Sequence, residues 1–211
     1  MLTIHHLRLS QSERIVWLAE ELGLDYELKL YTRRADNRLA PDDYKALHPM
    51  GIAPVITDGD LVLGESGAII DYIVARYAPG TPLVPGPDHP DFADHLFFYH
   101  WANATFMTNG MMALVAQFMG ASELPPFVAE RVAKGWQIVE ERLGKAAYFG
   151  GSQLTTADIM MGFQLTTARA MSGMSIDHLP NLKAYLKRIG ERPAYQRAMA
   201  RCEPGMPPKL D

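Results

Sequence analysis

The stretch GIAPVITDGDLVLGESGAIIDYI, residues 51–73, decides the fold of the N-terminal part of the chain. Within it, APVITDGDLVL has two apolar runs separated by Asp58-Gly59, and such a dipeptide strongly favours a tight hairpin between two strands. The following run, ESGAIIDYIVARY, has its apolar residues at helical spacing, so that one stripe holds Ile69, Tyr72, Ile73 and Tyr77. We therefore expect strand, strand and helix in this order.

The residues before this stretch predict a strand, a helix and a second strand. LTIHHLRL, residues 2–9, alternates loosely and is rich in residues that favour strands. In YELKLY, residues 26–31, apolar and polar residues also alternate, which predicts a second strand. Between them, apolar residues recur at helical spacing up to Leu22, and Gly23 is a typical residue to end a helix. A short helix is expected at 42–47. The order β-α-β followed by β-β-α predicts a four-stranded mixed sheet with helices packed on it.

The segment APGTPLVPGPDHP, residues 78–90, is the expected domain boundary, because its five prolines exclude a long helix. Beyond it no strand pattern occurs, and apolar residues recur at helical spacing. We expect an N-terminal domain over 1–78, a linker over 79–90 and an all-helical domain over 91–211, with helical stretches at 91–119, 126–147, 156–171, 180–190 and 193–201.

Composition limits the functions open to this chain. With 211 residues, 48% of them hydrophobic, it can bury a full core, and its net charge of −4 offers no basic face for nucleic acid. No apolar run reaches the length of a membrane span, and no histidine or cysteine spacing is typical of a metal site. A single cysteine, Cys202, excludes an internal disulfide and dithiol redox chemistry, which favours a reducing compartment such as the cytoplasm.

Two segments of the N-terminal domain suggest a ligand site. Pro54 opens a predicted strand; a trans bond would be ordinary, whereas a cis bond after Ala53 would expose the Ala53 peptide for pairing with a peptide-like ligand. Glu65 and Ser66 stand at the start of a helix, where Ser66 suits the N-cap. Alternatively, the N–H groups at the same helix start could bind the carboxylate of a ligand, and the Glu65 side chain could bind its ammonium. A carboxylate and an ammonium side by side are the head of an α-amino acid.

The segment SQSER, residues 10–14, has two interpretations. Ser10 and Glu13 match a capping box, which is a purely structural role. Alternatively Ser10 donates a hydrogen bond to an anionic ligand atom; no base for a nucleophilic serine is evident. Thr155 and Asp158 form a second capping box, which we interpret as structural. The aromatic run FFYHWANATFM, residues 97–107, suits a core or the wall of a pocket.

Together these segments resemble the glutathione transferase family over nearly the whole chain. The resemblance rests on the serine turn after the first strand, the segments HPMGIAPVITDG and DGDLVLGESGAIIDYI, the proline-rich linker and the TTAD box. It implies a thioredoxin-like α/β N-terminal domain, an all-α C-terminal domain, a homodimer, and glutathione as co-substrate without a metal. It also implies a cis bond at Pro54.

Residue by residue, the resemblance implies that the Ser10 hydroxyl binds the glutathione sulfur and favours the thiolate. It further implies that the Ala53 backbone pairs with the cysteinyl part and that Glu65 and Ser66 bind the γ-glutamyl head. The electrophile pocket would be bordered by Tyr99, Asn103 and Phe106.

The chain departs from the family at Ile52, where many relatives carry a lysine or polar residue toward the glycine carboxylate of glutathione. Arg38, Lys45 or His48 would then have to supply the charge. Ala53 and Gly67 are also smaller than usual. We expect a serine-type transferase that activates the glutathione thiolate for attack on a hydrophobic electrophile in detoxification or metabolism. The alternatives are a non-catalytic glutathione-fold binding or assembly protein, and a glutathione-dependent peroxidase or isomerase.

Overall fold

The structure, a computed structural model, describes residues 1–211. The chain forms two compact units. The first unit consists of Met1–Thr81 with Ile189–Lys209, and the second of Pro82–Arg188 with Leu210–Asp211. The boundaries expected from the sequence place residues 189–209 in the helical domain, whereas the structure groups them with the N-terminal residues.

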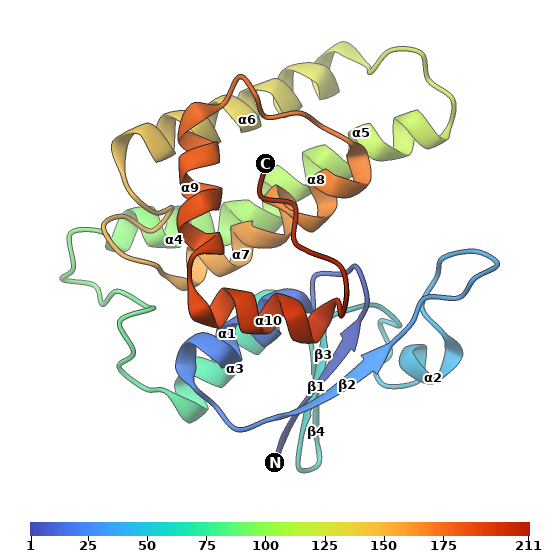
Figure 1. Cartoon of the computed structure of the whole chain (residues 1–211), viewed down its shortest axis with the longest axis vertical. Helices are drawn as coiled ribbons and strands as arrows, with labels where there is room; N and C mark the ends of the chain where they lie inside the picture. Colours follow the sequence, from blue (N-terminus) through green and yellow to red (C-terminus); the bar gives the residue numbers. More distant parts are fainter. The chain divides into compact units, whose positions relative to one another are not determined.

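A four-stranded sheet lies at the centre of the first unit (Figure 1), and its strands are β1 (Leu2–Leu7), β2 (Glu27–Tyr31), β3 (Val55–Asp58) and β4 (Leu61–Gly64). The strand order is β2-β1-β3-β4. β1 pairs parallel with β2 and antiparallel with β3, and β3 pairs antiparallel with β4. The mixed sheet predicted from the sequence is therefore confirmed. The hairpin turn is formed by Gly59 and Asp60, and Gly59 takes a φ of 59° that favours glycine.

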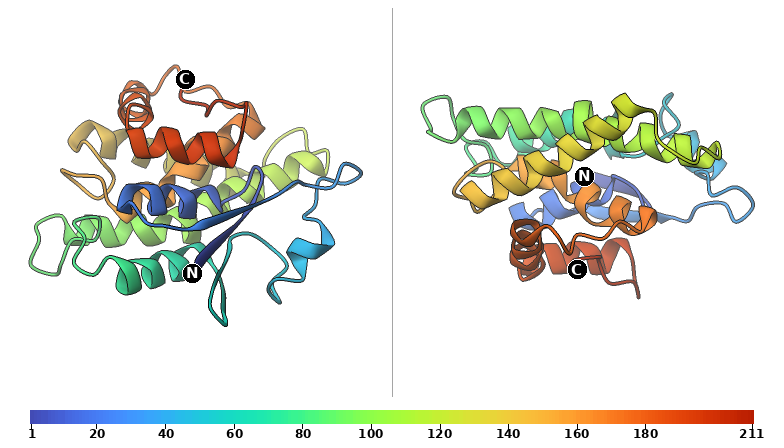
Figure 2. Two further views of the ribbon diagram at one scale, coloured as in Figure 1. Left: turned by 60° about the horizontal axis from the view of Figure 1, so that its bottom comes forward. Right: turned by 90° about the horizontal axis from the view of Figure 1, so that it is seen from above.

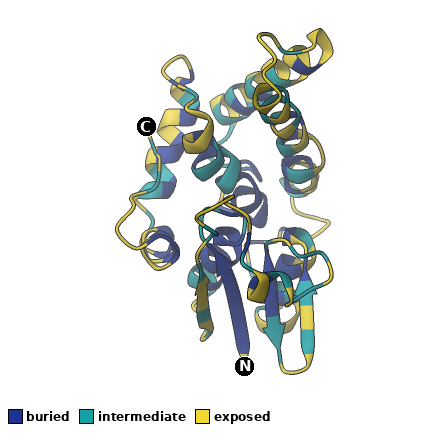
Figure 3. Ribbon diagram, turned by 90° about the vertical axis from the view of Figure 1, so that its right-hand side faces the viewer, coloured by how far each residue is buried: buried dark blue, intermediate teal, exposed yellow.

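The helices of the first unit are α1 (Glu13–Leu22), α2 (Asp42–Lys45), α3 (Ser66–Tyr77) and α10 (Pro193–Cys202). α10 packs on α1 (Figure 1). The rings of Trp17 and Tyr195 meet there edge to face, with their centroids 4.9 Å apart. α2 covers the opposite side of the sheet, and its Tyr44 lies in a buried cluster with Leu7, Ala40 and Val55. Because helices cover β1 on both faces, all six residues of this strand are buried (Figure 3).

The apolar stripe of α3 differs in part from the predicted one. Ile69, Ile70 and Ile73 are buried, but Tyr72 and Tyr77 are not. Both tyrosines instead donate hydrogen bonds to the Asp58 carboxylate, at 2.9 and 2.5 Å. The difference arises because a tyrosine can satisfy its hydroxyl only at the edge of the core.

The second unit is helical throughout, as the sequence predicts, with α4 (Phe92–Trp101), η1 (Ala102–Met107), α5 (Thr108–Phe118), α6 (Pro126–Lys145), α7 (Thr156–Leu165), α8 (Thr167–Ser172) and α9 (Pro180–Gly190). Figure 2 shows α5 and α6 running side by side. η1 is a π-helical turn within the predicted 91–119 helix, and a break at Thr166 divides the predicted 156–171 helix; neither was expected. No helix is both long enough and apolar enough to cross a membrane.

The predicted capping box at the start of α7 is confirmed. Thr155 Oγ1 accepts from the Ala157 N–H, and the Asp158 carboxylate accepts from the Thr155 N–H at 2.8 Å. Asp158 also accepts from the Phe149 N–H at 2.8 Å and from the Tyr185 hydroxyl at 3.2 Å. Burial raises the pKa of Asp158 to about 6, although these hydrogen bonds oppose the rise. One carboxylate thus joins three segments of the second unit.

Candidate active site

Three segments of the first unit converge at one end of the sheet. Since β3 runs antiparallel to both β1 and β4, the chain leaves β1, enters β3 and leaves β4 at the same end. Ser10 follows β1, the Ala53–Pro54 peptide precedes β3, and the Glu65–Ser66 pair follows β4. The sheet therefore makes neighbours of the three segments that resemble a glutathione site.

Ser10 does not form the predicted capping box, and that prediction is wrong. α1 begins at Glu13 with Ser12 as its N-cap, and no side chain makes a capping bond there. The Ser10 carbonyl, rather than its hydroxyl, accepts from the Glu13 N–H at 3.2 Å. The Ser10 hydroxyl oxygen lies 2.8 Å from Ser12 Oγ and accepts from the Ser12 N–H at 3.3 Å. The helix starts two residues too late for Ser10 to cap it.

A buried arginine links the starts of α1 and α3. Arg14 Nη1 donates to Gln11 Oε1 at 2.7 Å and to Ser66 Oγ at 3.4 Å. Burial lowers the pKa of Arg14 to about 10, with Glu13 opposing the change, so the guanidinium is charged at neutral pH. A fixed positive charge and two helix N-termini therefore gather at one end of the sheet, which favours an anionic ligand there.

The Glu65–Ser66 pair has a different capping arrangement from the expected one. α3 begins at Ser66 itself, and Glu65, not Ser66, occupies the N-cap with a φ of 71°. Such a φ is uncommon outside glycine and costs on the order of 1 kcal/mol, a strain that is often found at functional sites. Ser66 is buried, whereas Glu65 is exposed. The arrangement presents a carboxylate to solvent beside the N-terminus of the helix.

The peptide bond between Ala53 and Pro54 is cis, as the resemblance implies. β3 begins one residue later, at Val55, so the Ala53 peptide stands outside the hydrogen-bonded ladder of the sheet. Pro54 is buried and Ala53 is half-buried. The Ala53 backbone is thus placed next to the strand end that leads into α3.

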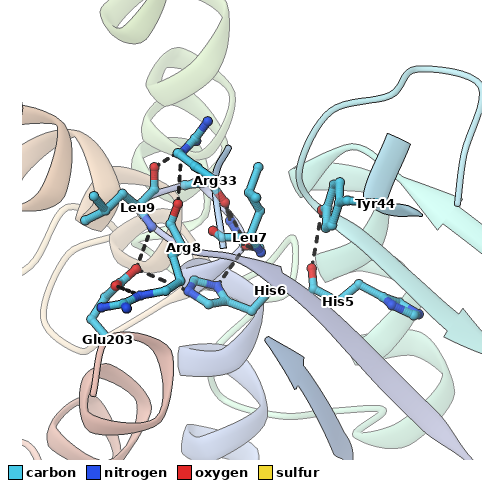
Figure 4. A network of polar contacts seen from close by, with 10 residues as sticks. His5, His6, Leu7, Arg8, Leu9, Arg33, Tyr44 and Glu203 are labelled. Atoms are coloured by element: carbon cyan, nitrogen blue, oxygen red, sulfur yellow. Dashed lines mark hydrogen bonds and ion pairs between the residues drawn. The ribbon is translucent and has the colours of Figure 1, made fainter. Parts of the chain in front are cut away.

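The loop that carries Ser10 is held from two sides by charged side chains (Figure 4). Arg33 donates from Nε to the Arg8 carbonyl at 2.9 Å and from Nη2 to the Leu9 carbonyl at 3.0 Å. Glu203 accepts from the Leu9 N–H at 2.5 Å and from Arg8 Nε at 2.9 Å. Leu9 has a φ of 55°, which these contacts fix. The sequence gives no signal for Glu203, because it is 194 residues from Leu9.

Ile52 is 58% exposed beside this end of the sheet. Two of the three residues suggested to replace the missing charge lie near Gly51, the neighbour of Ile52: a Cβ placed on Gly51 would be 3.8 Å from Lys45 Cβ, and the Gly51 N–H donates to the His48 carbonyl at 2.9 Å. The Lys45 ammonium is 3.5 Å from the exposed Asp42 carboxylate. Arg38 is exposed, and the His48 ring accepts from the Met50 N–H. Lys45 and His48 are therefore both placed beside the segment that carries Ile52.

The three residues expected at the electrophile pocket belong to α4 and η1 of the second unit. Tyr99 and Phe106 are buried, and Asn103 is half-buried. The Phe106 ring stacks on Trp101 at 4.8 Å, and a Cβ on Gly135 of α6 would lie 3.0 Å from it. Phe106 thus contributes to the packing of the unit. No three His, Cys, Asp or Glu side chains lie together in an arrangement that could hold a metal ion.

Comparisons with known proteins identify the family. The family model described as glutathione S-transferase, N-terminal domain, matches residues 10–76, and the model described as glutathione S-transferase, C-terminal domain, matches residues 102–193. Glutathione S-transferase 3 of Zea mays is 30% identical over 200 residues, which are 89% of this chain and 87% of the maize protein.

Glutathione S-transferase 3 of Schizosaccharomyces pombe is 37% identical, but over 110 residues, 51% of this chain and only 43% of the yeast protein. Among solved structures, a glutathione S-transferase from Actinobacillus pleuropneumoniae is 35% identical, with a TM-score of 0.85 over 96% of this chain and 93% of that one. The chain therefore belongs to the glutathione S-transferase family, whose members are enzymes that use glutathione as a substrate.

Proposed function

We propose that this chain is a serine-type glutathione transferase in which the Ser10 hydroxyl donates a hydrogen bond to the glutathione sulfur and so stabilises the thiolate. The observation that carries the proposal is the convergence of Ser10, the cis Ala53–Pro54 peptide and the start of α3 at one end of the sheet. Membership of the glutathione S-transferase family supports the same conclusion.

The required stabilisation is modest. A thiol with a pKa near 8.5 is only a few per cent ionised at neutral pH, and lowering that pKa by about two units is equivalent to roughly 2.7 kcal/mol. A hydrogen bond to a charged group contributes about 1.5–3 kcal/mol, and a helix N-terminus adds roughly 0.3–1 kcal/mol. Ser10 and the first turn of α1 can together supply this amount.

The remainder of glutathione would bind along the same end of the sheet. The Ala53 backbone pairs with the cysteinyl part of the tripeptide. Glu65 holds the ammonium of the γ-glutamyl head, while Ser66 and the N–H groups of α3 hold its carboxylate. Ile52 lies toward the glycine end, where the Lys45 ammonium takes the place of the missing polar partner.

The thiolate attacks a hydrophobic electrophile, and Tyr99, Asn103 and Phe106 are the candidates for contact with it. Asn103 has the most exposed surface of the three. As part of the same proposal, the enzyme is a homodimer that acts in the cytoplasm on small electrophiles, in detoxification or metabolism. Family membership supports these finer statements, and the solution mass tests the dimer.

The experiment compares wild type with Ser10→Ala and with Ser175→Ala, a control that removes an exposed serine of the second unit. Calorimetry gives the affinity for glutathione, and an activated aryl halide and an organic hydroperoxide serve as trial electrophiles. We expect Ser10→Ala to lower kcat/KM by about 10- to 100-fold, the equivalent of one hydrogen bond to a charged group, with little change in affinity.

Full activity in Ser10→Ala would remove Ser10 from this role. Absence of glutathione binding by wild type at millimolar concentration would instead favour a non-catalytic binding protein. Turnover of the hydroperoxide but not the aryl halide would identify a peroxidase on the same site.

A further inference from the structure

The Ser10 hydroxyl ends a chain of hydrogen bonds that leads from the candidate site into the interior of the first unit. Ser10 Oγ lies 2.8 Å from Ser12 Oγ, and Ser12 Oγ lies 2.8 Å from His6 Nδ1. On the far side of the ring, His6 Nε2 lies 3.4 Å from Glu203 Oε1. All four residues are buried, with exposed fractions of 5% or less. Figure 4 shows His6 and Glu203 facing each other in this network.

The Ser12 hydroxyl can connect its two neighbours in only two ways. It has a single proton, and it already accepts from the Leu7 N–H at 3.2 Å. Both 2.8 Å contacts are hydrogen bonds only when it donates to one of His6 and Ser10 and accepts from the other. Donation of the same proton to the Leu7 carbonyl would use a longer contact of 3.5 Å.

The protonation of His6 Nδ1 decides which way the chain points. When this nitrogen carries no proton, Ser12 donates to it and Ser10 donates to Ser12, so the Ser10 proton faces the interior. When Nδ1 carries a proton, both bonds reverse, and the Ser10 proton is free to point at a ligand. In both states the Ser12 N–H still donates to Ser10 Oγ. Only the second state allows Ser10 to donate to a thiolate.

Glu203 provides an acceptor for the Nε2 side of the His6 ring. Burial by itself raises the pKa of Glu203, but hydrogen bonds from His6, the Leu9 N–H and Arg8 outweigh it and hold the pKa below the usual glutamate range. The ionised carboxylate keeps a proton on His6 Nε2, which leaves Nδ1 as the acceptor, and it stabilises the imidazolium that forms on proton uptake.

The other ionisable groups near this carboxylate do not compete for the proton. Arg8 contacts Glu203 at Oε2, whereas His6 contacts it at Oε1, and a guanidinium accepts no proton. Burial raises the pKa of the Cys202 thiol, with the charges of Glu13 and Glu203 adding to the effect, so this thiol is neutral. The nitrogen that ends the hydrogen-bond chain on its inner side is therefore His6 Nδ1.

We propose that His6 accepts the proton of the glutathione thiol through Ser12 and Ser10, an inference that rests on the proposed function of Ser10. The thiol S–H bond breaks and its proton passes to Ser10 Oγ; the Ser10 proton passes to Ser12 Oγ, and the Ser12 proton to His6 Nδ1. The products are a thiolate that accepts a hydrogen bond from Ser10 and an imidazolium paired with Glu203. The proton leaves His6 for solvent when the conjugate departs. Ser12, His6 and Glu203 are positioning residues, since none of them contacts the sulfur.

A proton count tests this inference, because the thiol of free glutathione is almost wholly protonated at neutral pH. Each thiolate formed on binding must release its proton either to solvent or to the protein. The whole chain is mixed with glutathione in weak buffer containing an indicator dye, and ultraviolet absorbance reports the thiolate in the same sample. Binding of S-methylglutathione, which has no thiol proton, gives the background proton exchange to be subtracted.

In wild type we expect thiolate to form with well under one proton released per thiolate. Ser12→Ala, which breaks the chain but keeps His6 and Glu203, should either lose the thiolate or release one proton for each thiolate formed; His6→Gln should do the same. The matched control is His5→Gln, which removes the neighbouring buried imidazole of β1, bonded to Tyr31 and Thr57 instead. The control should retain the wild-type ratio.

Release of one proton per thiolate by wild type would overturn the inference without requiring any variant to fold. If thiolate forms in wild type and is lost in Ser10→Ala, but proton release is complete, the relay is refuted and the role of Ser10 stands. If no thiolate forms in wild type, the proposed function of Ser10 fails as well.

Discussion

Replacement of Asp158 tests the structure of the second unit most sharply. Asp158 is fully buried and accepts four hydrogen bonds, two of them from backbone N–H groups, those of Phe149 and Thr155, both at 2.8 Å. The other two donors, the Thr155 and Tyr185 hydroxyls, can turn to other partners. In Asp158→Ala the two buried N–H groups lose their acceptor and cannot move.

An unsatisfied buried donor costs about 1–3 kcal/mol, and loss of a helix cap costs about 1 kcal/mol. Burial disfavours the charged carboxylate of Asp158 and raises its pKa to about 6, so removal of this group offsets part of the destabilisation. We therefore expect Asp158→Ala to lower the free energy of unfolding by about 3–4 kcal/mol. Asp158→Asn keeps one acceptor oxygen and should cost about half as much.

The assay is urea denaturation followed by far-ultraviolet circular dichroism and by tryptophan fluorescence. If both probes give the same transition, unfolding is two-state and its free energy can be calculated from the curve. If the two transitions differ, the two units unfold separately. A cost below about 1 kcal/mol for Asp158→Ala would refute the reasoning, because that is less than one unsatisfied buried donor.

Three further outcomes are expected. Burial alone would raise the pKa of Glu203, but hydrogen bonds from His6, Leu9 and Arg8 outweigh it and lower this pKa. The stabilisation by Glu203 is therefore present above the ordinary glutamate range and is lost as the pH falls through the pKa of the folded state. In denaturation measured against pH, Glu203→Gln should weaken the decline in the free energy of unfolding at acid pH. Arg33→Met removes the hydrogen bonds that Arg33 donates to the Arg8 and Leu9 carbonyls, and it should lower kcat/KM several-fold by loosening the loop that carries Ser10. The control Arg34→Met loses only ion pairs with exposed Asp36 and Asp42 and should leave kcat/KM unchanged; equal effects would contradict a role of Arg33 in holding this loop. Ile52→Lys places an ammonium toward the glycine end of glutathione and should lower its KM about 2- to 5-fold, as expected for an exposed ion pair worth up to about 1 kcal/mol; an unchanged KM would show that Ile52 does not face the ligand.

The sequence predicts most of the first unit because its elements are local patterns. The alternating runs before Ser10 and after Leu24, the hairpin signal at Asp58-Gly59 and the helical spacing after Glu65 each depend on neighbouring residues, and β1 to β4 follow from them. The Thr155–Asp158 box is confirmed for the same reason. The Ser10–Glu13 box matches the same spacing and is wrong, because the chain after β1 takes one further turn before α1 begins.

The parts of the candidate site that local patterns miss are contacts across long stretches of chain. Glu203 meets His6 across 197 residues, and Arg33 holds the Arg8 carbonyl across 25. His6 is one of two adjacent histidines in an ordinary strand, and only the pleat of β1 decides that it faces Ser12 while His5 faces Tyr31 and Thr57. The sequence could therefore suggest Ser10 from family resemblance, but it could not show that Ser12 links Ser10 to His6.

The measurement that tests the central claim most directly is the pKa of the glutathione thiol bound to wild type and to Ser10→Ala. Thiolate absorbance is followed against pH with the protein saturated. In wild type the pKa should lie about two units below the ordinary thiol value near 8.5, and in Ser10→Ala it should rise by at least about one unit, the equivalent of 1.4 kcal/mol. The same pKa in both proteins would contradict the assignment of Ser10 as the residue that stabilises the thiolate.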